Sequence, residues 1–304
     1  MPAAAAAAAA APFTLHNVVV AGGFGGVGAF ITRELLATKA FASVKVIGRG
    51  SSSHKELQDS GATYAAVDYD SVDSIAAALA GADAVISTIG GAGLYQAQLN
   101  LVDAATKAGT VKLFLPSEFG IDLSRVPEAP LFGGKLAVAD KLYASGLNYT
   151  FVSTGFFTDT FFVPFLGFDL TPGAGFNIAG DGHAKNAFTH RADIGKFVAQ
   201  ILLHPHVALN KHISVHSDVL TAHEIAALVE AITGNKQALH IQTLADIRAK
   251  ITAKPGPTSF DNLQEQFILT IGNGDGAHYK SDNHLFPAVH PSSVKAFLES
   301  ALKK

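Results

Sequence analysis

Asn17-Val-Val-Val-Ala-Gly22-Gly-Phe-Gly25-Gly-Val-Gly28 is the stretch of sequence that decides the fold. The four residues after Asn17 are apolar and predict a buried strand, and the glycine-rich turn leads into an amphipathic helix over residues 26–38. A second apolar run, Val44-Lys-Val-Ile47, completes a strand–helix–strand unit. Such a unit predicts a parallel sheet with right-handed crossovers.

The glycine spacing in this turn indicates a dinucleotide site. Glycines at positions 22, 25 and 28 allow a tight turn, a close backbone approach to a pyrophosphate, and close packing of helix on strand. The helix that follows would direct free N–H groups and its positive dipole end at the phosphates. Glycine-rich turns also link strand to helix without a ligand, so the flanking strands and helix are what favour a cofactor. The expected contacts are Gly22, Gly23, Phe24, Gly25, Gly26, Val27 and Gly28.

The end of the second strand indicates which dinucleotide binds. In NAD-specific sites an acidic residue about 20 positions after the glycines holds the ribose hydroxyls. Here Arg49 stands 21 positions after Gly28. Its guanidinium can bind a 2′-phosphate in bidentate fashion, with hydrogen bonds from Ser51 and Ser52 and a second positive charge from Lys55. We therefore expect NADPH rather than NADH; the alternative is a solvated basic loop.

Strands and helices alternate through the first half of the chain. Strands are predicted over 63–67, 84–87, 111–115 and 149–153, and helices over 71–79, 95–108 and 135–145. The pattern predicts an α/β fold, a Rossmann-type doubly wound parallel sheet with a smaller C-terminal α/β substrate lobe. Ligands bind at the carboxyl ends of such strands, which places Thr88, Ile89 and Gly90 at the cofactor.

The second half is less regular, and residues 164–182 are rich in Phe, Gly and Pro. Helices are predicted over 193–203, 222–232, 244–253, 260–271 and 292–302, and a strand over 211–215. We expect a disordered Ala-rich tail over 1–11, an NAD(P)-binding domain over 12–155, and a mainly substrate-binding lobe over 156–304. Part of 190–216 is expected to return to the main sheet.

Composition favours an enzyme of the cytoplasm. The chain has 304 residues, 48% of them hydrophobic, and a formal net charge of −3 without a basic block, so we expect no nucleic-acid partner. The absence of cysteine excludes disulfides, thiolate catalysis and Cys-ligated metals. The N-terminal segment lacks the positive region of a signal peptide, and no apolar run is long enough to span a bilayer. Thirteen histidines include no His-Glu-x-x-His, so we expect no metal site.

Several segments together carry a family resemblance. They are Gly22 to Gly28, Val85-Ile-Ser-Thr-Ile-Gly90, Lys112-Leu-Phe-Leu-Pro-Ser-Glu-Phe-Gly120, Lys135 and Tyr149-Thr-Phe-Val-Ser153. In order and spacing they resemble the isoflavone reductase-like family of atypical short-chain dehydrogenases, in the NmrA-like group, over residues 16–200. The resemblance implies an NADPH-dependent reductase of aromatic, often phenolic, substrates. It also implies that Lys135 is the general acid or base and that Phe157 packs near the nicotinamide.

The proton-transfer residue of common short-chain dehydrogenases is missing. That group needs Tyr-x-x-x-Lys, and none of the six tyrosines here has a lysine four positions on. If the chain is a reductase, Lys135 is the best-placed candidate for proton transfer. The pattern places it in the first turn of a helix, where the helix dipole and desolvation disfavour an ammonium. The alternative is an ordinary surface lysine. Glu118 is the carboxylate expected to face the cleft, where orientation of its loop is favoured over direct catalysis.

Aromatic residues follow the strand at 149–153. From this region and the Pro-Ser-Glu-Phe-Gly segment, Phe119, Phe156 and Phe161 are predicted to contact the substrate, with simple core packing as the alternative. An asparagine usual in plant members is replaced by Gly155, which removes any hydrogen bond it would make.

These observations predict an NADPH-dependent reductase, monomeric or homodimeric. It would transfer hydride to a benzylic ether, a quinone methide or an enone of aromatic type. Two alternatives share the cofactor site: a non-enzymatic NmrA-like sensor of NAD(P), and an NADPH-quinone reductase.

Overall fold

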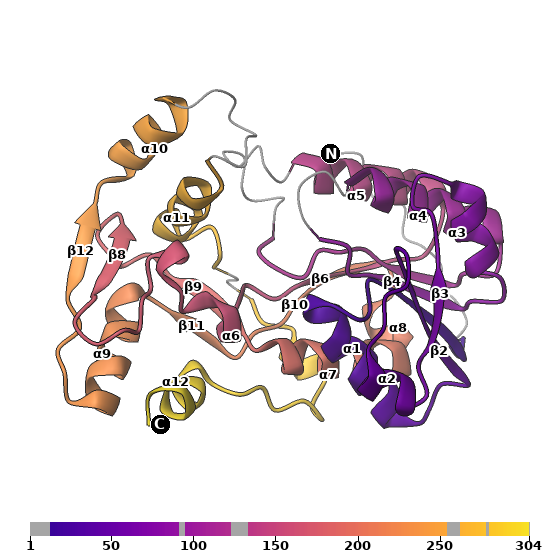
Figure 1. Ribbon diagram of the computed structural model, residues 1–304, viewed down its shortest axis with the longest axis horizontal. Helices are drawn as coiled ribbons and strands as arrows, with labels where there is room; N and C mark the ends of the chain where they lie inside the picture. The colour runs from indigo at the N-terminus through magenta and orange to yellow at the C-terminus, as the bar shows by residue number, and fades with distance from the viewer. Residues whose placement is uncertain (1–12, 91–94, 123–132, 254–261, 278–279, 304) are drawn as a thin grey trace.

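The computed structural model describes residues 13–90, 95–122, 133–253, 262–277 and 280–303 (Figure 1). The predicted tail over 1–11 lies outside these ranges. The main sheet is parallel and has the order β3-β2-β1-β4-β5. A parallel bridge between Phe114 and Tyr149 sets β6 beside β5, and β10 pairs with β6 in parallel. These strands are β1 (Asn17–Ala21), β2 (Ser43–Gly48), β3 (Thr63–Ala66), β4 (Ala84–Ser87), β5 (Leu113–Leu115), β6 (Thr150–Ser153) and β10 (Lys211–Ser214).

Helices cover both faces of this sheet because its strands are apolar on both faces. In β1, Val18 and Val20 belong to one buried cluster, and Val19 and Ala21 belong to another. Figure 1 shows α3, α4 and α5 on one face and α1, α2, α7 and α8 on the other. Their bounds are α1 (Gly26–Thr38), α2 (Lys55–Asp59), α3 (Val72–Ala78), α4 (Tyr95–Ala108), α5 (Gly133–Ser145), α7 (Arg191–Leu203) and α8 (Pro205–Ala208). The arrangement is the doubly wound α/β fold that the sequence predicted.

Most of the remaining elements surround a third apolar cluster, built on Phe161, Phe176 and Phe188, and a smaller fourth cluster contains Ile247 and Ile268. One small sheet has the order β11-β9-β7 and another pairs β12 with β8. The elements are β7 (Phe156–Phe157), α6 (Thr158–Phe161), η3 (Pro164–Leu166), β8 (Phe176–Ala179), β9 (Asn186–Thr189), β11 (Asp218–Leu220), α9 (Ala222–Thr233), β12 (Leu239–Gln242), α10 (Leu244–Ala253), α11 (Leu263–Asn273), η5 (Asn283–Leu285) and α12 (Val294–Leu302).

Two helices from different parts of the chain pack closely at the start of the sheet. A Cβ atom at Gly195 of α7 would lie 2.7 Å from the carbonyl oxygen of Phe30 in α1, so only glycine allows this approach. Within the described ranges, no helix is both long and apolar enough to cross a membrane. The same ranges contain no group of three His, Asp or Glu side chains arranged to hold a metal ion.

Candidate active site

The glycine turn joins the carboxyl end of β1 to the start of α1. The N–H of Gly22 donates to the carbonyl oxygen of Ile47 at 2.9 Å, and Gly22 takes a φ of 80° beside Thr88. A Cβ atom at Gly28 would lie 2.5 Å from both the carbonyl oxygen of Gly22 and Oγ1 of Thr88. A methyl group at Gly25 would instead meet no atom of the described residues within 4 Å. Helix α1 therefore packs closely against the sheet at Gly28 and faces open space at Gly25, the residue before its first turn.

A cavity of about 390 Å³ lies at the carboxyl ends of β1, β2 and β4. Arg49 and Ser52 line it, together with the predicted contacts Gly22, Phe24, Thr88, Ile89 and Gly90. The other two residues predicted at this end lie on the surface: Ser51 is exposed, and Lys55 is 87% exposed and pairs with Asp59 at 2.6 Å. Arg49 is thus the cation that the fold brings to this cavity from the predicted set.

Two tyrosines that the sequence analysis did not select also line this cavity. The hydroxyl of Tyr64 donates to the carbonyl oxygen of Gly50 at 2.8 Å, and its ring stacks on Phe24 with centroids 5.5 Å apart. The hydroxyl of Tyr69 donates to the carbonyl oxygen of Ile47 at 3.2 Å, and burial raises its pKa. The strand order explains the position of Tyr64, because β3 pairs with β2 and carries Tyr64 to the Arg49 loop. Tyr69 lies in the segment that follows β3.

A second cavity, of about 580 Å³, shares Thr88, Ile89 and Gly90 with the first. Its lining is largely apolar and comes from both halves of the chain. It includes the predicted residues Gly26, Val27, Phe119, Lys135, Phe156, Phe157 and Phe161. The structure therefore brings together side chains that the sequence placed at the cofactor, at the proton-transfer position and at the substrate.

Lys135 lies in the first turn of α5 and points toward the loop after β5. Its Nζ atom is 3.8 Å from Oε2 of Glu118, and the two side chains are 19% and 12% exposed. The Glu118 loop is fixed by Gln98, whose Oε1 accepts hydrogen bonds from the Ser117 N–H and from the Ser87 hydroxyl, both at 3.1 Å. The carboxylate places a negative charge beside Lys135, which the expectation from the helix start alone did not include.

Burial sets the electrostatics around this pair. Desolvation raises the pKa of the Glu118 carboxyl above its ordinary value, and Asp122 adds to the rise, while Lys135 acts in the opposite direction. Tyr95 of α4 lines the same cavity, and burial, reinforced by Glu118, raises the pKa of its hydroxyl. Its ring lies against Gly134, where a Cβ atom would be 2.1 Å from the ring. Tyr95, which the sequence analysis did not select, therefore stays protonated beside Lys135 at neutral pH.

The predicted phenylalanines serve the core and the cavity at once. Phe119, Phe156 and Phe161 are 7%, 8% and 1% exposed, and each also lines the 580 Å³ cavity. Further along the same wall, Phe165 is 43% exposed and packs edge-on against Phe267 of α11, with ring centroids 6.5 Å apart. The α11 contribution was not predicted from the sequence.

Gly155 is fixed by packing. It has a φ of 67°, and a Cβ atom there would lie 2.2 Å from the carbonyl oxygen of Ala187 in β9. Any larger residue would push β9 away from the end of β6.

The two cavities fit the two halves of a dinucleotide. One end carries Arg49 and polar backbone, the other is apolar and carries Phe157, and the glycine turn between them opens at a helix N-terminus. Thr88 links the two, and its hydroxyl donates to the carbonyl oxygen of Ala21 at 2.8 Å. The arrangement can hold a phosphorylated dinucleotide with its redox end beside Lys135.

Comparison with known proteins agrees with this geometry. The NmrA-like family model matches residues 14–269. The isoflavone reductase homolog IRL of Zea mays is 35% identical over 269 residues, 82% of this chain and 84% of that protein. The phenylcoumaran benzylic ether reductase IRL1 of Ginkgo biloba is 35% identical over 53% of this chain and 55% of its own length.

The solved structure of AtPrR2 with NADP⁺ and (+)pinoresinol is similar over 95% of this chain and 99% of that one, with a TM-score of 0.80 and 25% identity. The family match and these relatives agree with the segments that carried the resemblance. The chain belongs to the NmrA-like family and, within it, to the isoflavone reductase-like oxidoreductases.

Proposed function

We propose that this protein is an NADPH-dependent reductase of an aromatic or phenolic small molecule, with Lys135 as its general acid or base. The observation that carries the proposal is the placement of Lys135, paired with Glu118, on an apolar cavity that shares Thr88, Ile89 and Gly90 with the cavity of Arg49. A sensor of NAD(P) needs neither the enclosed lysine nor a second cavity.

The cofactor would be held by residues of known placement. Arg49 would bind the 2′-phosphate, and the turn from Gly22 to Gly28 would hold the pyrophosphate at the start of α1. Phe157 would lie beside the nicotinamide, which when bound supplies a hydride from C4 to an electron-poor carbon. Residues 12–155 would then provide most of the cofactor site, and 156–304 most of the substrate wall.

Lys135 would exchange a proton at Nζ with an oxygen of the substrate. Oε2 of Glu118 lies 3.8 Å from Nζ of Lys135, which is beyond hydrogen-bond distance. A substrate oxygen can therefore form a hydrogen bond with Nζ. Tyr95, protonated at neutral pH, adds a donor on the same wall. The substrate proposed here is a benzylic ether, a quinone methide or an enone, because an aromatic body fits the phenylalanine lining.

The test is a screen for NADPH oxidation with phenylcoumaran-type ethers, quinones and aromatic enones, run beside direct NADPH binding. We expect tight NADPH binding together with turnover of an ether or enone. Turnover of quinones alone would favour the NADPH-quinone reductase. Binding of NADPH with no turnover of any compound would favour the sensor.

A further inference from the structure

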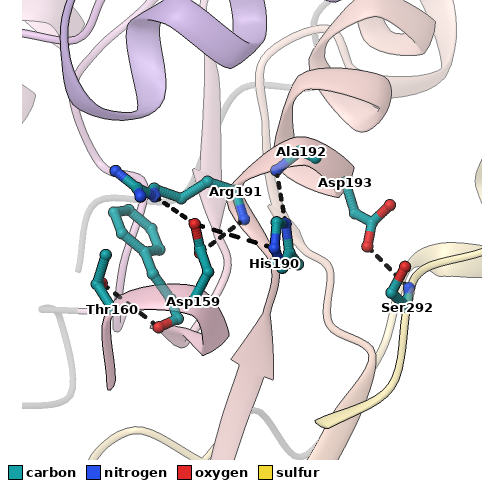
Figure 2. A network of polar contacts seen from close by, with 8 residues as sticks. Asp159, Thr160, His190, Arg191, Ala192, Asp193 and Ser292 are labelled. Atoms are coloured by element: carbon teal, nitrogen blue, oxygen red, sulfur yellow. Dashed lines mark hydrogen bonds and ion pairs between the residues drawn. The ribbon is translucent and has the colours of Figure 1, made fainter. Parts of the chain in front are cut away.

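A partly buried ion pair links the substrate wall to the first turns of the dinucleotide helix. Asp159 lies in the single turn of α6, between the cavity residues Phe157 and Thr160. Its Oδ2 accepts a hydrogen bond from Nε of Arg191 at 2.8 Å, and its Oδ1 accepts one from the Arg191 backbone N–H at 3.2 Å. Figure 2 shows this carboxylate between Arg191 and His190, whose Nε2 is 4.0 Å from Oδ2.

The pair lies just beyond the end of a β-ladder. Phe157 of β7 is in register with Thr189 of β9, and Asp159 and Arg191 each follow two positions later. Their side chains are 10% and 23% exposed, so the contact is largely shielded from solvent. Because β7 has only two residues and α6 only four, this segment makes few backbone hydrogen bonds of its own, and the carboxylate adds two hydrogen bonds to α7.

The other side of Arg191 contacts α1. Its guanidinium lies over the ring of Phe30, 5.1 Å from the centroid. The same helix begins with Gly26 and Val27, which line the 580 Å³ cavity together with Phe157. One arginine thus touches both the substrate wall and the helix that starts at the cofactor turn.

We propose that Asp159 and Arg191 are positioning residues for the nicotinamide half of the site. The inference rests on the proposed function, since it assumes that NADPH places its nicotinamide in the 580 Å³ cavity. The ion pair fixes the distance between Phe157 and Val27, and so sets the width of the space that the nicotinamide enters. Neither residue lines either cavity, so both act through the segment that they hold.

A positioning role and a purely stabilising role predict different effects on ligand affinity. An ion pair that only stabilises the fold would, when broken, lower the unfolding temperature and leave the ligand affinities of the folded protein unchanged. A positioning pair affects ligands that reach the nicotinamide half and leaves the adenosine half alone. The cofactor fragment 2′,5′-ADP separates the two, because it contains the 2′-phosphate and lacks the nicotinamide.

The experiment compares the full-length wild type with Asp159→Asn, Asp159→Glu and Arg191→Met. Arg33→Met is the matched control, because the Arg33 guanidinium faces the same Phe30 ring at 5.7 Å but pairs with Glu56 of α2. Dissociation constants are measured for NADPH by nicotinamide fluorescence and for 2′,5′-ADP by calorimetry. Unfolding temperatures are recorded for each protein.

We expect the three variants of the pair to weaken NADPH binding by about tenfold and 2′,5′-ADP binding by less than about twofold. Arg33→Met should change neither constant by more than about twofold. Asp159→Glu keeps the charge and displaces it by one methylene, so it tests position even if the neutral variants fail to fold.

The positioning role would be overturned if folded Asp159→Glu bound NADPH with wild-type affinity, or if the variants lost equal affinity for NADPH and 2′,5′-ADP. Either result would leave the proposed function standing. Failure of the wild type to bind NADPH while it still binds 2′,5′-ADP would overturn the proposed function and this inference together.

Discussion

Nζ of Lys135 lies 3.8 Å from Oε2 of Glu118, and the two side chains are 19% and 12% exposed. An enclosed pair of this kind is weakly screened by solvent, and Lys135 counteracts part of the rise that burial causes in the pKa of Glu118. Lys135 comes from the start of α5 and Glu118 from the loop after β5, at the carboxyl end of the sheet. Lys135 lines the larger cavity, and Glu118 supplies a negative charge next to it.

Lys135→Ala should abolish turnover while NADPH binding is retained. General acid–base catalysis contributes about 10²–10⁴-fold, and turnover is expected to fall by that amount. Lys141→Ala is the matched control, because Lys141 lies on the same helix and pairs with Asp103 at 2.8 Å, away from the cavity. Steady-state kinetics and NADPH titration of both variants check the assignment, and undiminished turnover in Lys135→Ala would refute it.

The pH profile should report Glu118. Since burial raises its pKa, the carboxylate protonates at a higher pH than an ordinary glutamate does, and Lys135 then loses its counter-charge. We expect kcat/KM to fall on acidification through a pKa above 4.5, the ordinary value, and Glu118→Gln to remove this acid limb. If the pH profiles of kcat/KM for the wild type and Glu118→Gln had identical acid limbs, a group other than Glu118 would cause the fall in activity.

Arg49 should decide cofactor choice. Hydrogen bonds to charged groups are worth about 1.5–3 kcal/mol, so Arg49→Ala is expected to weaken NADPH binding by about 10–100-fold. NADH lacks the 2′-phosphate, and its dissociation constant should stay within about twofold, as should both constants in the control Arg33→Ala. Parallel losses for NADPH and NADH in Arg49→Ala would contradict a 2′-phosphate contact.

Gly25 and Gly28 should respond differently to the same added methyl group. A Cβ atom at Gly28 would lie 2.5 Å from the carbonyl oxygen of Gly22, so Gly28→Ala should lower the free energy of unfolding by about 1–3 kcal/mol. At Gly25 the added methyl group meets open space and φ is −127°, so Gly25→Ala should keep its stability and weaken NADPH binding. Thermal unfolding and NADPH titration separate the two, and a stable Gly28→Ala would argue against the tight turn.

Local patterns predicted much of the fold. Helices α1, α4 and α10 and strand β4 have the bounds that periodicity and glycine placement indicated, because their apolar faces are set by residues within the element. The glycine turn and Arg49 could also be predicted from the sequence. Glycine spacing sets the position of the turn, and the length of the second strand sets the position of Arg49. The helix predicted over 260–271 is described from Leu263 and extends to Asn273.

The rest of the site depends on contacts between distant segments. Tyr64 reaches the Arg49 loop because β3 pairs with β2, and Tyr95 lines the same cavity as Lys135 because its ring packs on Gly134. Phe267 enters the cavity from α11, far along the chain from Phe165. No local period encodes these contacts, which arise only when the sheet order and the packing of the small sheets are known.

The central claim is tested most directly by following the hydride itself. The protein is incubated with NADPH deuterated at C4 of the nicotinamide and with phenylcoumaran-type ethers, aromatic enones and quinones, and the products are examined by mass spectrometry. Deuterium is expected on a carbon of an ether or enone product with the wild type and with Lys141→Ala, and none above background with Lys135→Ala. Absence of deuterated product from every compound, by a wild type that binds NADPH, would contradict the central claim.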